Sequence, residues 1–466
     1  MKVEQIYTGC LSEAAYYIES QGEAAIIDPL RETAPYIKRA EKDNAKIKYV
    51  FETHFHADFV SGHVELAQKT GAQIVYGPEA SCDFDCHIAE DGEEFKIGDL
   101  TIRTIHTPGH TPESTTYLLL DENGKEYCIF SGDTLFINDV GRPDLAIKSD
   151  LTVYDLAGMM YDSLRNKILP LPDHIIVYPA HGAGSACGKN LAKETFDTLG
   201  HQKEVNYALK PQTKEEFITA ITDGLTPAPK YFPLNAMMNK QGVKGLDEIN
   251  EVALKGLSPK EFEAAALISE ALILDTRAPQ TFVQGFVPGS INIGLDGQFA
   301  PWVGALITGI EQPIMLVCDE GREEETIMRL ARVGYDHTLG YLAGGIAAWE
   351  SSGKPIDSIE NVTAAEFAER LYHKDLHILD VRRPGEYEAA HITNVANRPL
   401  DYLNDWMGEL QPEHTYYIHC QGGYRSMIVA SILKARGYDH VIDIAGGYGA
   451  IARTTLPKAS GVDATA

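Results

Sequence analysis

Short apolar runs separated by polar or glycine-containing turns fill the first half of the chain. Runs of this kind, rich in Ile, Val, Tyr and Leu, predict strands. The predicted strands are Ala24–Asp28, Gln73–Tyr76, Leu100–Ile105, Thr115–Leu120 and Tyr127–Phe130. A helical pattern from about Gly62 to Thr70 stops at Gly71, a residue type that favours a helix C-terminus. Because strands and helices mix over residues 1–245, we expect one layered α/β domain there.

The second half contains an internal repeat. Ser258-Pro-Lys-Glu261 and Thr363-Ala-Ala-Glu366 both match the capping box of a helix start, and each is followed by a strand. Each copy closes with Ala-Gly-Gly, at 343–345 and 445–447, so corresponding landmarks lie about 100 residues apart. A period of domain size indicates duplication, and strands alternating with helices predict a doubly wound parallel sheet in each copy. We place these two domains at 246–355 and 356–466.

Composition narrows the class of protein. The net charge of -27 over 466 residues disfavours nucleic acid and anionic membrane surfaces as partners, because both need a basic face. No apolar run approaches the length of a membrane span. Seven cysteines are scattered along the chain, an odd number that fits reduced thiols rather than a disulfide framework. We therefore expect a cytoplasmic protein.

The strongest chemical signal is the segment Thr53-His-Phe-His-Ala-Asp-Phe59, directly behind the apolar run Ile47–Phe51. Two histidines and an aspartate alternate here, which is a pattern of metal ligands at a strand end. Phe59 stands where a two-metal hydrolase with this motif has another histidine. Because phenylalanine cannot bind a metal, the motif favours a single ion with open positions.

Three later segments each place one further candidate ligand at the end of a predicted strand or in a tight turn. Thr107-Pro-Gly-His-Thr-Pro112 presents His110, Phe130-Ser-Gly-Asp-Thr134 presents Asp133, and Tyr178-Pro-Ala-His-Gly182 presents His181. A single fragment of this kind is weak evidence, but four in this order predict a metal site.

This order of motifs resembles the metallo-β-lactamase superfamily. Within it, the match to Thr53–Asp58, Thr107–Pro112 and Ser131-Gly-Asp-Thr134 leading into Gly141-Arg-Pro-Asp144 is closest to the persulfide dioxygenase branch. The resemblance implies an αββα sandwich and one Fe(II) per chain. The implied iron ligands are His54, His110 and Asp133, and the implied outer groups are His56, Asp58 and His181. Two imidazoles and one carboxylate are also the ligand set of non-haem Fe(II) oxygenases, which keep positions open for substrate and O₂.

Cys187 lies in a glycine-rich segment six residues after His181. Glycines let a backbone approach a site closely, so this thiol could carry a persulfide sulfur near iron. A similarity to dioxygenase–rhodanese fusion proteins, which have a comparable segment, supports that role. The alternative, a small buried hydrophobic residue, remains equally open.

The C-terminal copy has a second reactive cysteine. Cys420 ends the predicted strand Tyr416–His419 and opens a loop before a helix. Backbone N–H groups of such a loop, the helix N-terminus and the charge of Arg425 would together stabilise a thiolate and attract an anion. The sulfur-binding loop is predicted to contain Gln421, Gly422, Gly423, Tyr424 and Ser426.

With Asp380-Val-Arg382, this loop resembles the rhodanese family. Cysteine phosphatases of related fold are the alternative, but their loop is usually longer than the span from Cys420 to Arg425. The middle copy departs from the pattern, because five carboxylates crowd the loop after Cys318 and disfavour both a thiolate and an anionic substrate. We interpret that copy as catalytically degenerate, with Asp275 and Arg277 forming an ion pair that serves the fold.

The sequence therefore predicts Fe(II)-dependent oxidation of a low-molecular-weight thiol persulfide by O₂, giving sulfite and thiol. Cys420 would move sulfur between a persulfide or thiosulfate and sulfite, in a direction that the sequence does not fix. Two alternatives stay open: a metal-dependent thioesterase of the glyoxalase II type, and a persulfide carrier or redox sensor using Cys187 and Cys420. The identity of the thiol is not readable, and a homodimer is implied only by resemblance.

Overall fold

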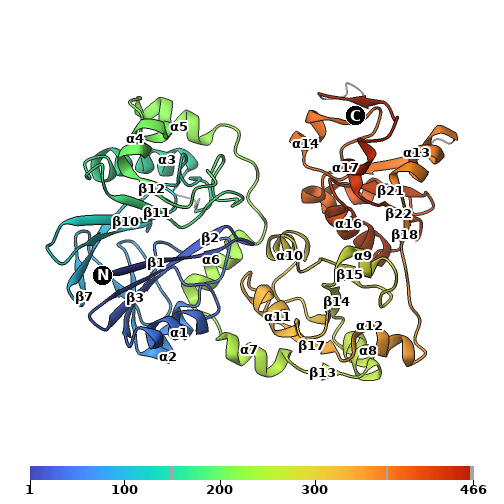
Figure 1. Ribbon diagram of the computed structural model, residues 1–466, viewed down its shortest axis with the longest axis horizontal. Coiled ribbons are helices and arrows are strands. Elements are labelled where there is room, and N and C mark those ends of the chain that lie inside the picture. Colours follow the sequence, from blue (N-terminus) through green and yellow to red (C-terminus); the bar gives the residue numbers. More distant parts are fainter. Residues whose placement is uncertain (147–150, 374–375, 462–466) are drawn as a thin grey trace. The chain divides into compact units, whose positions relative to one another are not determined.

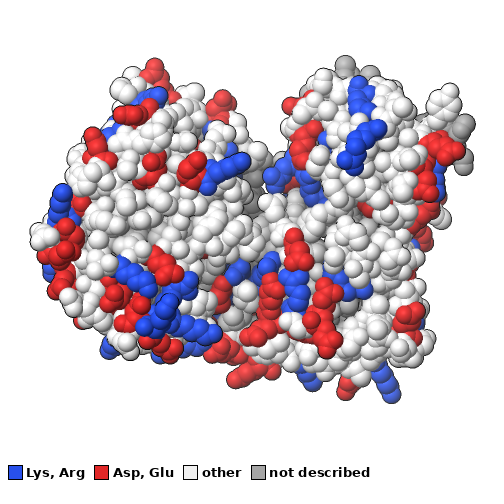
Figure 2. All heavy atoms as spheres, in the orientation of Figure 1, with Lys and Arg blue, Asp and Glu red and all other residues white. Residues whose placement is uncertain are grey.

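The computed structural model describes residues 1–146, 151–373 and 376–461. The chain divides into two compact units, one formed by Met1–Glu248 with Ala331–Gly334 and the other by Ile249–Leu330 with Tyr335–Ala466 (Figure 1). Acidic and basic side chains are interspersed over the face shown in Figure 2. Within the described ranges, no helix has both the length and the apolar character needed to cross a membrane.

The first unit is built on two six-stranded sheets. In spatial order the first sheet contains β1 (Lys2–Thr8), β2 (Glu13–Ser20), β3 (Glu23–Ile27), β4 (Lys46–Phe51), β5 (Gln73–Tyr76) and β6 (His87–Ile88). The second sheet contains β12 (Asp197–Thr198), β11 (Ile176–Pro179), β10 (Glu126–Gly132), β9 (Thr115–Leu120), β8 (Leu100–His106) and β7 (Glu94–Ile97). The five strands and the helix predicted from this half of the sequence are all present, with small shifts at their ends.

Helices cover the outer faces of both sheets. On the first sheet lie α1 (Ala34–Lys42) and α2 (His63–Thr70), and on the second lie α3 (Val153–Ser163), η1 (Leu164–Ile168), α4 (Leu199–Val205), η2 (Tyr207–Leu209) and α5 (Lys214–Thr222). Helices α6 (Phe232–Gln241) and α7 (Leu246–Ala253) follow in the chain. Figure 1 shows α1 and α2 on one side of the paired sheets and α3, α4 and α5 on the other.

Strand β2 shows why the layers form in this order. Its residues Ala14, Tyr16 and Ile18 join the core between the two sheets, whereas Ala15 and Tyr17 pack in a second core with residues of α1 and α2. Successive side chains of a strand point to opposite faces, so a strand that is apolar on both faces must be covered on both. The result is the predicted αββα sandwich, and this part of the fold prediction is confirmed.

The second unit contains two parallel sheets. The first has the order β13 (Gly256–Leu257), β17 (Thr338–Leu342), β16 (Ile314–Val317), β14 (Leu272–Asp275) and β15 (Ile291–Asn292). The second has the order β18 (Glu360–Val362), β22 (Val441–Ile444), β21 (Tyr416–His419) and β19 (His377–Asp380). A small antiparallel pair, β20 (His391–Ile392) and β23 (Lys458–Ala459), accompanies it.

Helices separate these strands in the chain, as the sequence predicted. In the middle domain they are α8 (Pro259–Ile268), α9 (Pro279–Phe282), α10 (Phe299–Leu306), α11 (Glu323–Ala331) and α12 (Gly345–Ser351). In the C-terminal domain they are α13 (Ala364–His373), α14 (Pro384–Ala389), η3 (Leu400–Tyr402), α15 (Leu403–Trp406), η4 (Met407–Glu409), α16 (Tyr424–Ala435) and α17 (Gly447–Ile451). Two doubly wound domains therefore follow the sandwich.

Equivalent ion pairs mark the duplication in three dimensions. Arg277 and Asp275 lie 2.6 Å apart, as do Arg382 and Asp380, and all four side chains are buried. Each arginine also donates to a backbone carbonyl eight residues further on, at Gly285 or Ala390. The predicted Asp275–Arg277 pair is confirmed, and it ties the end of a central strand to the following loop.

Candidate metal centre and cysteine loop

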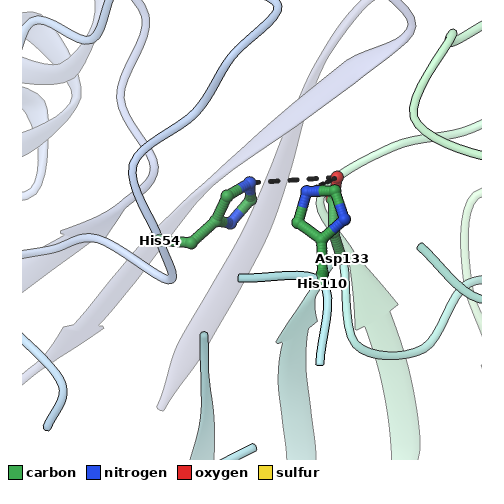
Figure 3. Close-up of side chains that lie close together, drawn as sticks. All are labelled: His54, His110 and Asp133. Carbon is green, nitrogen blue, oxygen red and sulfur yellow. Dashed lines mark ion pairs between the residues drawn. The ribbon is translucent and has the colours of Figure 1, made fainter. Parts of the chain in front are cut away.

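Three predicted ligands meet where strands of both sheets end. His54 follows β4 of the first sheet, and His110 and Asp133 follow β8 and β10 of the second. The Nε2 atom of His110 lies 3.3 Å from Oδ2 of Asp133, and Nε2 of His54 lies 3.9 Å from the same oxygen. All three side chains are buried and point toward one another (Figure 3). Their ligand atoms are close enough to share one metal ion.

Hydrogen bonds fix the imidazole of His54 in the tautomer that a metal requires. The Oγ1 of Thr53 lies 2.8 Å from Oδ2 of Asp28 and 3.0 Å from Nδ1 of His54. The single hydroxyl proton goes to the carboxylate, so the hydroxyl oxygen accepts from Nδ1–H of His54. The Nε2 lone pair of His54 is thereby left free to bind a cation.

His110 is oriented in the same way. Its Nδ1 lies 2.8 Å from the backbone carbonyl oxygen of Arg142, which can only accept, so Nε2 carries the free lone pair. The Oδ2 atom of Asp133, toward which both histidines point, is buried and has no hydrogen-bond partner within the described part of the chain. A buried carboxylate oxygen without a partner is costly unless it binds a cation, so this donor set fits a bound metal.

The charges around Asp133 agree with this assignment. Burial alone would raise the pKa of Asp133, but His181, His110 and His54 together lower it far below its usual range. Burial, together with His56, holds the pKa of His54 well below the ordinary histidine value. The site therefore presents an ionised carboxylate and neutral imidazole, the protonation states that metal ligands need.

The place beside this centre contains His56, Asp58 and His181, which could also surround a cation. The imidazole of His181 instead lies between two carboxylates, with Nε2 2.9 Å from Asp58 and Nδ1 2.8 Å from Asp133. Burial alone would lower the pKa of His181, but Asp133 and Asp58 more than offset burial and raise it well above the usual value. The two carboxylates therefore favour the protonated form of His181, and a positive charge there disfavours a second metal ion beside it.

Phe59 packs against the histidine of the same group. Its ring is fully buried and its centroid lies 4.3 Å from that of His56. Phenylalanine offers no lone pair, so the group of His56, Asp58 and His181 lacks the additional histidine that a two-metal motif of this type has. Both observations favour occupation by a single metal ion.

Two acidic residues near this site were not predicted. Nε2 of His56 lies 3.1 Å from Asp28 and 3.6 Å from Glu52, and both acids are buried. Burial and the neighbouring Asp28 raise the pKa of Glu52 well above its usual value. In the sequence, Asp28 and Glu52 each directly follow a strand, β3 and β4, and this position was the one sign of a role. The parallel pairing of β3 with β4 brings the two acids together, and the sequence alone does not show that pairing.

Cys187 joins the centre from the glycine-rich loop. Its sulfur lies within ligand reach of Asp133 and His181, and the side chain is buried. The backbone N–H of Arg142 donates to the carbonyl of Cys187 at 2.9 Å, which connects the Gly141–Asp144 motif to this loop. Burial, reinforced by Asp58 and Asp133, raises the pKa of the Cys187 thiol well above its usual value. The thiol is therefore near the metal position but protonated.

The second cysteine predicted to react opens a compact loop. Cys420 follows β21 and is only 1% exposed. The backbone N–H of Gly423 donates to its sulfur at 3.1 Å, and Gly423 adopts a φ of +106° that favours glycine. Helix α16 begins at the next residue, so its N-terminus faces the loop.

The segment that begins at Ala445-Gly-Gly447 is hydrogen-bonded to the backbone of this loop. The N–H of Tyr448 donates to the Cys420 carbonyl at 2.7 Å, and that of Gly449 donates to the Gln421 carbonyl at 3.0 Å. A Cβ atom on Gly447 would lie only 2.3 Å from the carbonyl oxygen of Cys420. The glycine is required because the two backbone segments are in direct contact.

The side chains of the loop do not all face the sulfur. The guanidinium of Arg425 makes two hydrogen bonds to Glu386, at 2.6 and 2.8 Å, so part of its charge is balanced. Gln421 and Gly422 are exposed and Ser426 is buried. Tyr424 points into the middle domain, where its hydroxyl donates to the carbonyl of Gly294 at 2.7 Å.

The equivalent cysteine of the middle domain is poorly suited to react. Burial, with Glu323, Asp275 and Asp319, raises the pKa of Cys318 to about 12. Arg322, which follows it, pairs with Asp296 at 2.8 Å and with Glu325 at 2.9 Å rather than facing an open anion site. These contacts support the interpretation of a degenerate copy.

Two protein-family models match this chain. The model described as "Metallo-beta-lactamase superfamily" matches residues 8–181, and the one described as "Rhodanese-like domain" matches residues 258–352 and 363–454. A solved metallo-beta-lactamase from Staphylococcus aureus subsp. aureus COL is 32% identical with a TM-score of 0.66, over 73% of this chain and 98% of that one.

Two curated relatives match the first unit at similar identity. Human persulfide dioxygenase ETHE1, mitochondrial, is 35% identical over 161 residues, which are 34% of this chain and 59% of that protein. A cytoplasmic hydroxyacylglutathione hydrolase of Arabidopsis thaliana is 33% identical over 177 residues, which are 37% of this chain and 65% of that protein. The chain thus spans about three fifths of the length of each.

Proposed function

This chain belongs to the metallo-beta-lactamase superfamily and carries two rhodanese-like domains, and on that premise we propose that it is a persulfide dioxygenase coupled to a sulfurtransferase. The observation that carries the proposal is the buried set of His54, His110 and Asp133. Beside it, Phe59 offers no ligand, and His181 lies between Asp58 and Asp133. Two imidazoles and one carboxylate suit a single ferrous ion.

Ferrous iron held by these ligands would supply the redox chemistry that O₂ requires, which zinc lacks. The overall reaction is RSSH + O₂ + H₂O → RSH + SO₃²⁻ + 2H⁺. The chain's own contribution is to keep both Nε2 atoms deprotonated through Thr53 and the Arg142 carbonyl, and to keep Asp133 ionised beside His181. The substrate thiol remains undefined.

At the second site, Cys420 is the sulfur carrier. Its thiolate attacks the terminal sulfur of a persulfide, giving Cys420–SSH and releasing RS⁻. Sulfite then attacks that outer sulfur, so thiosulfate leaves and the Cys420 thiolate returns. The N–H of Gly423 stabilises the Cys420 thiolate each time it is regenerated. The N-terminus of α16 and the charge of Arg425 favour an anionic acceptor.

Housing both sites in one chain raises the effective concentration of the shared sulfite. The proposal predicts one iron per chain, O₂ consumption and sulfite formation with a thiol persulfide. Asp133→Ala is expected to lose bound iron and O₂ uptake. Cys420→Ser is expected to stop thiosulfate formation while O₂ uptake continues. O₂ uptake at the wild-type rate in Asp133→Ala would contradict the proposal.

A thioesterase of the glyoxalase II type is the second candidate, favoured by the similar identity to the Arabidopsis hydrolase. It predicts two bound metal ions and hydrolysis of a glutathione thioester without O₂. Metal content and an anaerobic thioester assay on the same preparation separate the two functions. Two zinc ions and anaerobic hydrolysis would establish the thioesterase.

A further inference from the structure

Tyr424 of the active cysteine loop contacts the degenerate middle domain. Its ring lies against the segment Gly294–Gly297, which follows β15, and its hydroxyl donates to the carbonyl of Gly294 at 2.7 Å. A Cβ atom on Gly297 would lie 2.4 Å from the ring carbon that bears the hydroxyl. Gly297 has an ordinary φ, and the three atoms nearest to an added Cβ all belong to Tyr424, so the tyrosine ring is the first obstacle to a side chain there.

The segment that receives Tyr424 is held by the remnant of the middle domain's own cysteine loop. Arg322, four residues after Cys318, pairs with Asp296 at 2.8 Å. Arg329 of α11 donates to the carbonyl of Leu295 at 2.7 Å. Glu325 lies 2.9 Å from Arg322 and 2.6 Å from Arg329, so one carboxylate holds both arginines.

Tyr424 is also well placed to influence the reactive sulfur. It is the first residue of α16 and directly follows Gly423, whose N–H donates to Cys420 at 3.1 Å. Farther along α16, Ser431 accepts a hydrogen bond from the N–H of Asn292 in β15 at 2.8 Å. Helix α16 is therefore hydrogen-bonded to the middle domain at its first residue, Tyr424, and near its middle, at Ser431.

We propose that the middle domain has exchanged an anion site for a positioning role: its acidic loop fixes Gly294–Gly297, and this segment sets Tyr424 and the neighbouring Gly423 N–H against the Cys420 sulfur. Arg322 of that loop binds Asp296, and Arg329 of α11 binds the Leu295 carbonyl. The inference rests on the proposed role of Cys420 as sulfur carrier. Tyr424 is a positioning residue, since its side chain does not touch the sulfur.

The test measures how readily the Cys420 thiolate forms. The rate at which iodoacetamide alkylates Cys420 in the full-length protein is followed across pH, by mass spectrometry of the peptide that contains it. In Gly297→Ala the ring must move, and we expect the midpoint of the pH–rate profile to rise by about one pH unit, a tenfold smaller thiolate fraction below both midpoints. Tyr424→Phe, which removes only the hydroxyl, is expected to shift the midpoint in the same direction by less.

A matched control separates this effect from a general loss of stability. Gly408 has no heavy atom within 4 Å of an added Cβ and an ordinary φ, so Gly408→Ala should keep the wild-type profile. Asp296→Asn changes an exposed residue, 75% exposed in its side chain, and should produce a smaller rise by loosening Arg322. If Gly297→Ala does not fold, Tyr424→Phe and Asp296→Asn decide the matter.

Wild-type midpoints in folded Tyr424→Phe and Gly297→Ala would overturn the inference. Alkylation does not need sulfur transfer, so the two proposals fail separately. Shifted profiles in a protein without sulfurtransferase activity would keep the positioning role and remove the proposed function. Normal sulfur transfer together with unshifted profiles in the variants would keep the proposed function and remove the positioning role.

Discussion

Replacing Thr53 by valine tests whether the outer hydrogen bonds prepare the metal site. Valine has the shape of threonine but no hydroxyl, so His54 loses the acceptor that lies 3.0 Å from its Nδ1. Asp28 loses one donor at 2.8 Å but keeps the backbone N–H of residue 53 at 2.7 Å. The carboxylate therefore stays in place, and the change acts mainly on the imidazole.

The expected size follows from the burial of His54, which is 1% exposed. An Nδ1–H without an acceptor costs about 1–3 kcal/mol in such a place. The metal-free protein can relieve this cost by changing the tautomer or turning the ring, and metal binding must then reverse that change. Loss of an outer hydrogen bond to a metal-binding histidine typically weakens metal affinity about 10- to 100-fold, or about 1.4–2.7 kcal/mol.

The assay is the Fe(II) dissociation constant, measured without oxygen by competition with a chelator. Thr53→Ser keeps the hydroxyl and should bind iron within about twofold of wild type, well under the 1.4 kcal/mol of a tenfold change. Thr104 is a second fully buried threonine, and its hydroxyl has no partner within the described residues. Thr104→Val should therefore leave the affinity unchanged. Equal affinities for Thr53→Val and wild type would refute the reasoning.

Three further predictions concern single residues. When metal-free protein is loaded with zinc, Phe59→His should bind about two ions per chain instead of about one by elemental analysis, because it adds a ligand beside His56, whereas Phe59→Leu should not. Burial raises the pKa of Asp443 from 3.8 to about 6, so the folded state disfavours its ionised form. The stability of the wild type relative to Asp443→Asn should therefore be highest below pH 3.8 and fall as the pH rises through about 6, by about 3 kcal/mol in urea unfolding. Cys318→Ser should leave thiosulfate formation unchanged, and a loss greater than about twofold would contradict the degenerate interpretation, since a fully formed catalytic cysteine contributes far more.

The sequence predicted the fold because its signals are local. The apolar strands, the capping box at Ser258 and the repeated Ala-Gly-Gly each depend on a few adjacent residues. The positions of His54, His110 and Asp133 were also readable, since a motif behind a strand places its side chains at the sheet edge. Whether these residues bind iron remains a prediction.

The contacts that surround these residues could not be read in the same way, because they join distant parts of the chain. The predicted role of Arg425 at the sulfur stays a prediction, and the structure adds a partner, Glu386, 39 residues earlier. Tyr424 of the predicted sulfur-binding loop likewise has a partner that the sequence did not indicate, the carbonyl of Gly294, 130 residues earlier. Such partners are set by strand order and domain packing, which spacing along one sequence does not reveal.

The metal ligands also have a mechanical consequence. His54 comes from one sheet, whereas His110 and Asp133 come from the other. A cation shared among them acts as a cross-brace through the sandwich, and any ligand that binds only the folded form raises its resistance to unfolding. Loss of that cation would remove part of this rigidity and make the first unit easier to unfold and to cleave.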